Sequence, residues 1–185
     1  LEHGSKEAKE YFPLTDEIIR NHLTGKTTVG VYPLLTDDRC WFLAVDFDKL
    51  EWANDAREFL KTCWEWDVPA ALERSRSGNG GHVWIFFSRA IEAALARQLG
   101  TAILTWTMER RHLLGLDSYD RFFPSQDTLP KGGFGNLIAL PLQHRPREEG
   151  NSVFVDAELR AFEDQWAVLS GLRRMSPSDV EGTIE

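Results

Sequence analysis

Two aspartates separated by one residue close an apolar segment of the sequence. The run Trp41-Phe42-Leu43-Ala44-Val45 leads into Asp46 and Asp48 and predicts a buried strand over residues 41–48. Side chains two residues apart on a strand project from the same face, which places the two Cβ atoms about 7 Å apart. Paired carboxylates suit Mg²⁺ or Mn²⁺, and two such ions about 3.5–4 Å apart can activate a hydroxyl against a triphosphate. The alternative is a solvated strand end that carries two unrelated acids.

A loop rich in glycine and arginine joins the next two predicted strands, residues 70–73 and 82–87. Its candidate phosphate ligands precede His82, the first residue of the second strand: Arg74, Arg76, Ser77, Gly78 and Gly80. Glycine lets successive backbone N–H groups turn toward an anion, and arginine can bind phosphate oxygens through two donors. No Gly-Lys-Ser/Thr sequence opens a helix after this loop, so it is not a Walker A motif. The alternative is a flexible hairpin followed by a surface histidine.

Charged side chains crowd the turn-rich segment 115–134. They include three acids and two bases: Asp117, Asp120, Asp127, Arg121 and Lys131. Long irregular loops with mixed polar residues serve function more often than stability. The segment is therefore predicted to be functional, with Arg121 and Lys131 as candidate nucleotide-binding residues.

Hydrophobic periodicity predicts the elements that must position these residues. Helices are expected at 15–23, 52–66, 90–112 and 157–169, and further strands at 28–32, 136–142 and 152–155. Thr15 is a candidate N-cap of the first helix, Gly25 its terminator, and Gly100 a candidate kink in the longest helix. Strands and helices alternate irregularly, which predicts an α+β fold: a mixed sheet with helices flanking at least one face.

Length and composition fit one domain. The chain has 185 residues, of which 42% are hydrophobic and 27% charged, close to the averages of globular proteins. Residues 1–5 resemble a cloning scar, so the folded domain is placed at 6–170. Residues 171–185 are polar and lack periodicity, which predicts a frayed tail or the start of a linker.

Cysteine content and hydropathy exclude several classes of protein. The two cysteines, Cys40 and Cys63, cannot form a disulfide framework or a four-cysteine zinc site. No stretch approaches the roughly 20 apolar residues that a membrane span needs, and no signal peptide heads the chain. A reducing, cytoplasmic location with no membrane partner is therefore expected.

The net charge of −8 is unevenly distributed along the chain. Residues 71–147 carry 10 Lys and Arg against 6 Asp and Glu, whereas the segments on either side each have a net charge of −6. Seven Trp and eleven Phe supply rings that could stack on bases, although most such rings are expected to fill the core. A nucleic-acid partner is therefore compatible with an acidic chain whose middle is basic.

These motifs are similar to those of a known family. The apolar strand that ends in Asp-x-Asp resembles the first motif of the archaeo-eukaryotic primase superfamily, and Gly80-Gly81-His82 resembles its small-residue-x-His motif. The sequence resembles the primase domain of TOTE conflict systems and CRISPR-associated primase-polymerases more closely still. This closer resemblance covers the segments 73–78, 118–121, 135–143, 150–156 and 164–166. The resemblance extends from about residue 14 to residue 170.

The resemblance implies an RRM-like catalytic core that carries out template-directed nucleotidyl transfer from (d)NTPs, including de novo primer synthesis. It implies that Asp46 and Asp48 bind two Mg²⁺ or Mn²⁺ ions and that His82 contacts the phosphates of the nucleotide. The third metal-binding acid is expected to be Asp120, in Tyr119-Asp120-Arg121. Three other acids remain alternatives for this role: Asp117, Asp127 and Asp156.

The implied partners are a single-stranded DNA template or primer-template, (d)NTPs, and the rest of a larger multidomain protein. Relatives often have serine where this sequence has Gly80, so Ser77 is the candidate for a hydroxyl contact to phosphate. Two other functions remain open. The acids could serve a metal-dependent nuclease, or the arginines and aromatic rings could serve a non-catalytic module that binds single strands.

Overall fold

A five-stranded sheet lies at the centre of the computed structural model, which describes residues 12–111 and 116–185. The strand order is β5 (Tyr119–Phe123), β2 (Arg39–Phe47), β4 (Gly81–Glu92), β3 (Ala70–Arg74) and β7 (Val153–Val155). Each of these ladders is antiparallel, and a parallel bridge joins Phe87 to Met175 beside β4. The predicted scar at residues 1–5 lies outside the described residues.

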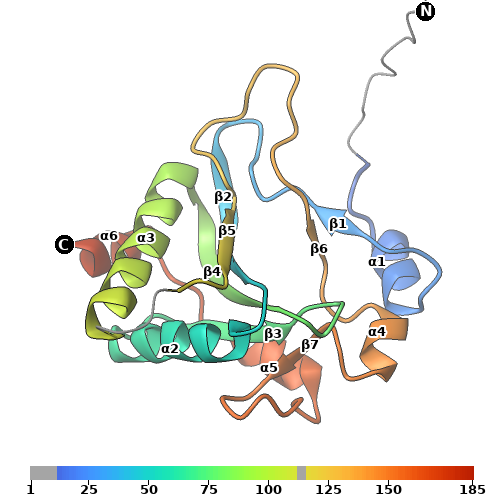
Figure 1. Cartoon of the computed structure of the whole chain (residues 1–185). Coiled ribbons are helices and arrows are strands. Elements are labelled where there is room, and N and C mark those ends of the chain that lie inside the picture. The colour runs from blue at the N-terminus through green and yellow to red at the C-terminus, as the bar shows by residue number, and fades with distance from the viewer. Residues whose placement is uncertain (1–11, 112–115) are drawn as a thin grey trace, which may run out of the picture.

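Three helices cover one face of this sheet (Figure 1): α2 (Trp52–Glu65), α3 (Ala93–Arg111) and α6 (Pro177–Ile184). Alternate residues of β2 supply the core beneath them, because Leu43, Val45 and Phe47 are fully buried with side chains from these helices. Period-two alternation thus sends one set of β2 side chains into the core and the other set to the opposite face.

The opposite face of the sheet meets a second, smaller layer, seen beyond the sheet from α2 and α3 in Figure 1. This layer contains α1 (Asp16–Leu23), the antiparallel pair of β1 (Gly30–Val31) and β6 (Ile138–Ala139), α4 (His144–Glu148) and α5 (Gln165–Gly171). Ile138 packs with Ala44, Trp84 and Phe123 of the sheet in a separate small core. A groove of about 1440 Å³ also runs between the two layers.

A buried histidine fixes the position of α1 within the smaller layer. His22 Nδ1 accepts the backbone N–H of Val29 at 3.1 Å, and its Nε2 lies 3.0 Å from the carbonyl oxygen of Pro141. Nε2 is therefore the protonated nitrogen in the neutral ring. The side chain joins α1 to the segments on both sides of the β1–β6 pair.

Most predicted elements are confirmed, together with the α+β class and its flanking helices. Five elements form within one to three residues of their predicted ends or extend beyond them. They are the helices predicted at 15–23 and 52–66 and the strands predicted at 41–48, 70–73 and 82–87. The Thr15 hydroxyl accepts the N–H of Ile18, as expected of an N-cap, and Gly25 follows α1 in the left-handed region. The last residue of the predicted helix 90–112 lies outside the described residues.

Three predicted boundaries are wrong because tertiary contacts override local propensity. Residues 90–92 belong to β4 instead of the following helix, since Ile91 pairs with Cys40 of β2 and is buried. The predicted strand 136–142 forms only at 138–139. The predicted helix 157–169 begins at residue 165, because the Asp156 carboxylate accepts the N–H groups of Glu158 and Arg160 and holds that segment in a turn.

The prediction of a frayed tail at 171–185 is also wrong. Met175 exchanges two backbone hydrogen bonds with β4, at Phe86 O and Ser88 N. The capping box of Ser176 and Asp179 then starts α6, whose Val180 is fully buried against the core. A single buried apolar side chain and a cap are too weak a periodic signal to predict this helix from sequence.

Two short elements had no predicted counterpart. The strand β5 forms inside the segment expected to be turn-rich, and α4 follows Gln143. Within the described chain, no helix has the length and apolar composition needed to cross a membrane.

Gly100 lies inside α3, which is continuous from residue 93 to residue 111, and it has a steric role there. A Cβ at this position would lie 2.8 Å from the ring of Phe122 and 2.9 Å from Leu43, both buried. We expect Gly100→Ala to lower the free energy of unfolding by about 1–3 kcal/mol through overpacking, despite the better helix propensity of alanine.

Gly182 of α6 provides the matched control, because a Cβ there meets nothing within 4 Å. Gly182→Ala should raise the free energy of unfolding by about 0.5–1 kcal/mol. Urea denaturation followed by circular dichroism measures both values. An equally stabilising Gly100→Ala would contradict the close approach of α3 to β5.

Candidate active site

Asp46 occupies the centre of the site because β2 is paired on both sides. It lies opposite His82 of β4 and opposite Arg121 of β5. Directly opposed residues of an antiparallel pair project from the same face. The register therefore gathers a carboxylate, an imidazole and a guanidinium on the face of the sheet away from α2 and α3.

An irregularity in β5 brings a second acid to the same place. Phe47 pairs with Tyr119 and Asp46 with Arg121, so Asp120 is the extra residue of a β-bulge. Bulges redirect side chains that regular alternation would send to the opposite face. Asp120 accepts a hydrogen bond from Arg121 Nε, and its charge acts on Asp46.

Asp48 follows β2 directly and is held by a short chain of buried contacts. Its N–H donates to the carbonyl oxygen of Ser118 at 2.8 Å. Ser118 in turn donates from its N–H and its Oγ to the carboxylate of Asp55 in α2, at 3.2 and 2.6 Å. Asp55 is buried, so this contact anchors the start of β5 beside the end of β2.

Burial and repulsion both raise the pKa of Asp46. Burial of the carboxylate is the largest cause, and the charges of Asp120 and Asp48 raise the pKa further, against the opposing effects of His82 and Arg121. Asp48 and Asp120 are therefore both close enough to Asp46 to repel its carboxylate. With its pKa raised in this way, the ionised form of Asp46 is costly unless additional positive charge is present.

The carboxylates fit a divalent cation by their chemistry, although they are not gathered into a compact cage. Among the described residues, no group of three or more His, Cys, Asp and Glu side chains has the arrangement of a metal site. Asp46 and Asp120 instead face His82 and Arg121. Asp48 Oδ1, however, is buried without a hydrogen-bond partner, as expected of an oxygen that serves as a ligand of a metal ion.

His82 is held between two carboxylates. Its Nδ1 lies 3.0 Å from Glu73 Oε2 and its Nε2 lies 3.6 Å from Asp46 Oδ1. Burial by itself would lower the pKa of His82, but the hydrogen bond and charge of Glu73, with the charge of Asp46, raise the pKa overall. The imidazolium form is thus favoured beside the acids.

Glu73 was not among the predicted site residues. Leu72 before it points into the main core, so alternation places Glu73 on the face of the sheet that carries His82. That alternation is the signal that could have found it. A hairpin of unknown register, however, does not reveal which residue Glu73 faces.

Glycines let the loop between β3 and β4 approach the acids closely. A Cβ on Gly80 would lie 2.7 Å from the carbonyl oxygen of Phe47 and 3.5 Å from Cα of Asp48. Gly78 has φ +77° and leaves no room for a side chain beside Asn151. Ser77 Oγ accepts the N–H of Asn79 within the loop. The loop backbone therefore lies against the end of β2.

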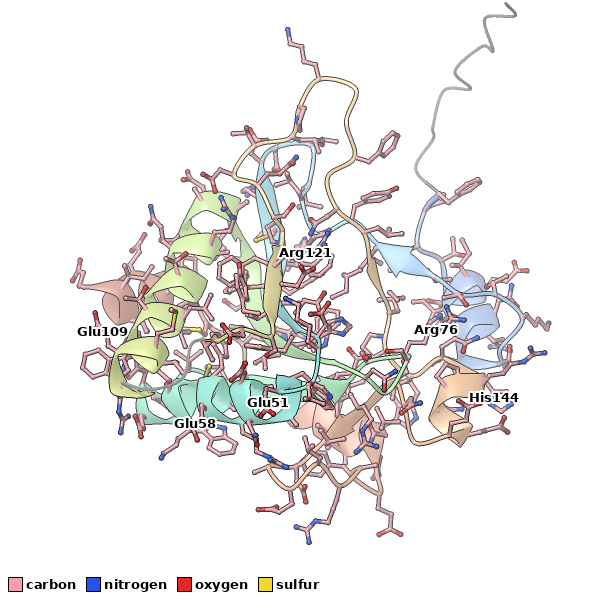
Figure 2. The ribbon with its side chains drawn as sticks, in the orientation of Figure 1. Glu51, Glu58, Arg76, Glu109, Arg121 and His144 are labelled. Carbon is pink, nitrogen blue, oxygen red and sulfur yellow. The ribbon has the colours of Figure 1, made fainter. Side chains whose placement is uncertain are left out.

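The arginines predicted to bind phosphate have different surroundings. Arg74 donates to the carbonyl oxygens of Gly150 and Leu159, at 2.8 and 2.5 Å, and so ties β3 to the segments around β7. Arg76 is exposed at the β3–β4 turn, and Arg121 projects from β5; both are labelled in Figure 2. Within residues 12–111 and 116–185, no hydrogen bond or ion pair is made by the Arg76 guanidinium.

Several predicted residues are not brought to this cluster. The loop that carries Asp127 and Lys131 is joined to the other end of β2, where Leu129 N–H donates to Asp38. Asp38 precedes β2 and lies eight positions before Asp46, which corresponds to about 25 Å of extended chain. Asp127 pairs there with Arg97.

The remaining alternatives for the third acid are placed less favourably than Asp120. Asp156 forms an ion pair with Arg160 and caps a turn beyond β7. Asp117 is exposed, and its carbonyl oxygen accepts Lys49 Nζ. Asp120 is therefore the candidate that the bulge of β5 brings beside Asp46.

Aromatic side chains line the groove on the same face of the sheet. Phe42, Trp84 and Phe86 form a row of ring contacts, with Trp84 and Phe86 stacked at an interplanar angle of 8°. Trp41 and Phe134 line the groove further along. Trp84 also contacts the ring of His82 edge-on, so the aromatic row reaches the candidate site.

Comparison with known families gives one match over nearly the whole chain. A family model described as the archaeo-eukaryotic primase domain of the TOTE conflict system matches residues 2–183. No curated protein shows a significant match to this sequence.

We expect Asp46→Asn to stabilise the protein in the presence of a chelator at neutral pH. A raised pKa in the folded state means that the ionised carboxylate costs stability once the pH exceeds that pKa, and asparagine removes the cost. The gain should appear as a raised melting temperature in the chelator. Mg²⁺ or Mn²⁺ should raise the melting temperature of the wild type and have little effect on the variant.

Asp117→Asn is the matched control, because it removes an exposed acid outside the cluster. It should leave both the melting temperature in chelator and the response to metal unchanged. Differential scanning fluorimetry with EDTA, Mg²⁺ and Mn²⁺ measures all of these. A wild type that is indifferent to metal, with a destabilised Asp46→Asn, would contradict the assignment.

Proposed function

Because the chain belongs to the archaeo-eukaryotic primase domain family of TOTE conflict systems, we propose that it is the catalytic core of a DNA primase-polymerase. It would add nucleotides from (d)NTPs to a strand directed by a DNA template. The observation that carries the proposal is the convergence of Asp46, Asp48 and Asp120 beside His82 and Arg121. Family membership supports nucleotidyl transfer, and this cluster supplies the groups that such a reaction needs.

In this reaction the 3′-hydroxyl oxygen of the growing strand bonds to the α-phosphorus of the nucleotide as the bond to pyrophosphate breaks. Two Mg²⁺ or Mn²⁺ ions held by Asp46, Asp48 and Asp120 would supply the charge that activates the hydroxyl and neutralises the leaving group. The acids determine where that charge is placed, because two of them lie on adjacent strands and the third directly follows β2.

The triphosphate is proposed to lie between these acids and the loop that connects β3 and β4. His82 presents its Nε2 on the side of Asp46, and Gly80 brings the loop backbone against the end of β2. Arg121 and the exposed Arg76 are the guanidinium groups available for phosphate oxygens. Arg74 is assigned a structural role instead, because its donors already have carbonyl partners.

The template is proposed to follow the aromatic groove between the two layers. Stacking of bases on rings is tolerant of sequence, as a template site must be. The row that contains Trp84 ends beside His82, so a strand in the groove would reach the nucleotide. De novo priming, a larger parent protein and a cytoplasmic location remain predictions from the sequence.

We expect Asp120→Asn to reduce nucleotide addition at least 100-fold, as Asp46→Asn and Asp48→Asn should, because each removes a charge needed for the metals. The assay uses a single-stranded template, Mg²⁺ or Mn²⁺ and labelled nucleotides, with and without a primer. Asp117→Asn and Asp156→Asn are controls that should retain activity. If Asp120→Asn retained activity and one of the controls lost it, the role of third metal-binding acid would pass to the residue changed in that control.

The same assay separates the proposed activity from the two alternatives. A nuclease would shorten the labelled strand instead of extending it. A binding module would retain the strand equally well with and without metal, and would extend nothing.

We expect Trp41→Ala to weaken binding of single-stranded DNA roughly 5- to 100-fold, the scale of one lost base–ring stack. Trp41 lines the groove and is 51% exposed. Trp64→Ala is the matched control, because Trp64 is 56% exposed but lies on α2, which packs against the opposite face of the sheet. Fluorescence anisotropy with a labelled oligonucleotide measures both. Equal losses in the two variants would argue against the groove.

A further inference from the structure

A buried carboxylate, Glu73, lies behind the candidate phosphate-binding histidine. Glu73 is 2% exposed and belongs to β3, the strand next to the one that carries His82. Its Oε2 accepts Trp84 Nε1–H at 2.8 Å and lies 3.0 Å from His82 Nδ1. Both neighbours are ring nitrogens, and one oxygen of the carboxylate contacts the two of them.

Glu73 occupies a position where an apolar residue would be expected. The small core on this face contains Ala44, Ala71 and Phe154, and burying a carboxylate among such side chains is costly without strong hydrogen bonds. Within the described parts of the chain, no Lys or Arg forms a salt bridge with it. Glu73 contacts the two ring N–H groups, so its presence is best explained by its effect on the orientation of the two rings.

The contact with Glu73 determines which edge of the His82 ring faces the site. An imidazole that donates from Nδ1 to a carboxylate can rotate no further without losing that bond. Its Nε2 must then point in the opposite direction, and it lies 3.6 Å from Asp46. Trp84 restrains the carboxylate in the same way, because its indole N–H holds the shared oxygen.

We propose that Glu73 is a positioning residue for nucleotide addition, which holds His82 through Nδ1 so that Nε2 is presented to the phosphates of the bound nucleotide. This inference rests on the proposed function. Glu73 does not touch the nucleotide. Trp84 completes the arrangement by fixing the orientation of the carboxylate, and so links the aromatic groove to the phosphate site.

The test compares Glu73→Gln, His82→Ala and the double variant by steady-state kinetics with one nucleotide. A lost hydrogen bond to a charged group predicts a decrease in kcat/KM of roughly 10- to 100-fold for Glu73→Gln, with a raised KM for the nucleotide. A purely structural role would reduce the active fraction, and hence kcat, without changing KM. Because Glu73 acts through His82, the double variant should be no slower than His82→Ala alone.

Two further variants keep the test decisive if Glu73→Gln does not fold. Glu73→Asp retains the charge but draws the carboxylate back by one methylene, and should show the same loss and the same raised KM. Trp84→Phe removes the indole donor and leaves the contact between Glu73 and His82, so its effect should be smaller. Full additivity in the double variant, or an unchanged KM in both Glu73 variants, would overturn the proposal.

Nitrogen-15 NMR of the histidine rings separates this inference from the proposed function. The wild type should show His82 Nδ1–H protected from exchange, and Glu73→Asp should lose that protection. A protected Nδ1–H in a protein that adds no nucleotide would refute the proposed function while leaving the orientation of the ring intact. An unprotected Nδ1–H in an active wild type would overturn the role of Glu73 alone.

Discussion

Repulsion of the partly buried Asp46 carboxylate by two neighbouring acids is the constraint on which the rest of this structure depends. Asp46 is brought near Asp48 and Asp120 on one face of the sheet, where burial already disfavours its charged form. Without a constraint from the backbone, such side chains would turn toward water. The backbone prevents this, because Asp46 is paired on both sides and the start of β5 is tied to α2 through Ser118 and Asp55.

The stability needed to hold this cluster comes from the opposite face of the same strands. Leu43, Val45 and Phe47 alternate with Ala44 and Asp46 along β2 and are fully buried beneath α2, α3 and α6. Burial of each large side chain contributes about 1.5–3 kcal/mol. One face of the sheet can therefore carry charge that weakens the fold, because the other is filled with apolar side chains.

The sequence predicts the parts of the site that depend on local pattern. The position of Asp46 follows from an apolar strand, and the closeness of the β3–β4 loop from its glycines. Asp120 could be named from the resemblance, but its placement requires a bulge in β5, a strand that the pattern did not predict. The loop that carries Lys131 contacts Asp38 beyond the other end of β2, and position along the chain does not reveal which end of β2 a loop accompanies.

Contacts that depend on register were the hardest to predict, and Glu73 shows why. A glutamate in a short strand has the same local pattern whether it meets solvent or a histidine on the next strand. Only the strand register that pairs Glu73 with His82 and Ala71 with Trp84 brings the Glu73 carboxylate between two ring nitrogens. A shift of one residue in that hairpin would move His82 into the main core and Val83 to the site. The apolar residues that pack under the helices therefore determine the register, and through the register they determine the chemistry on the other face.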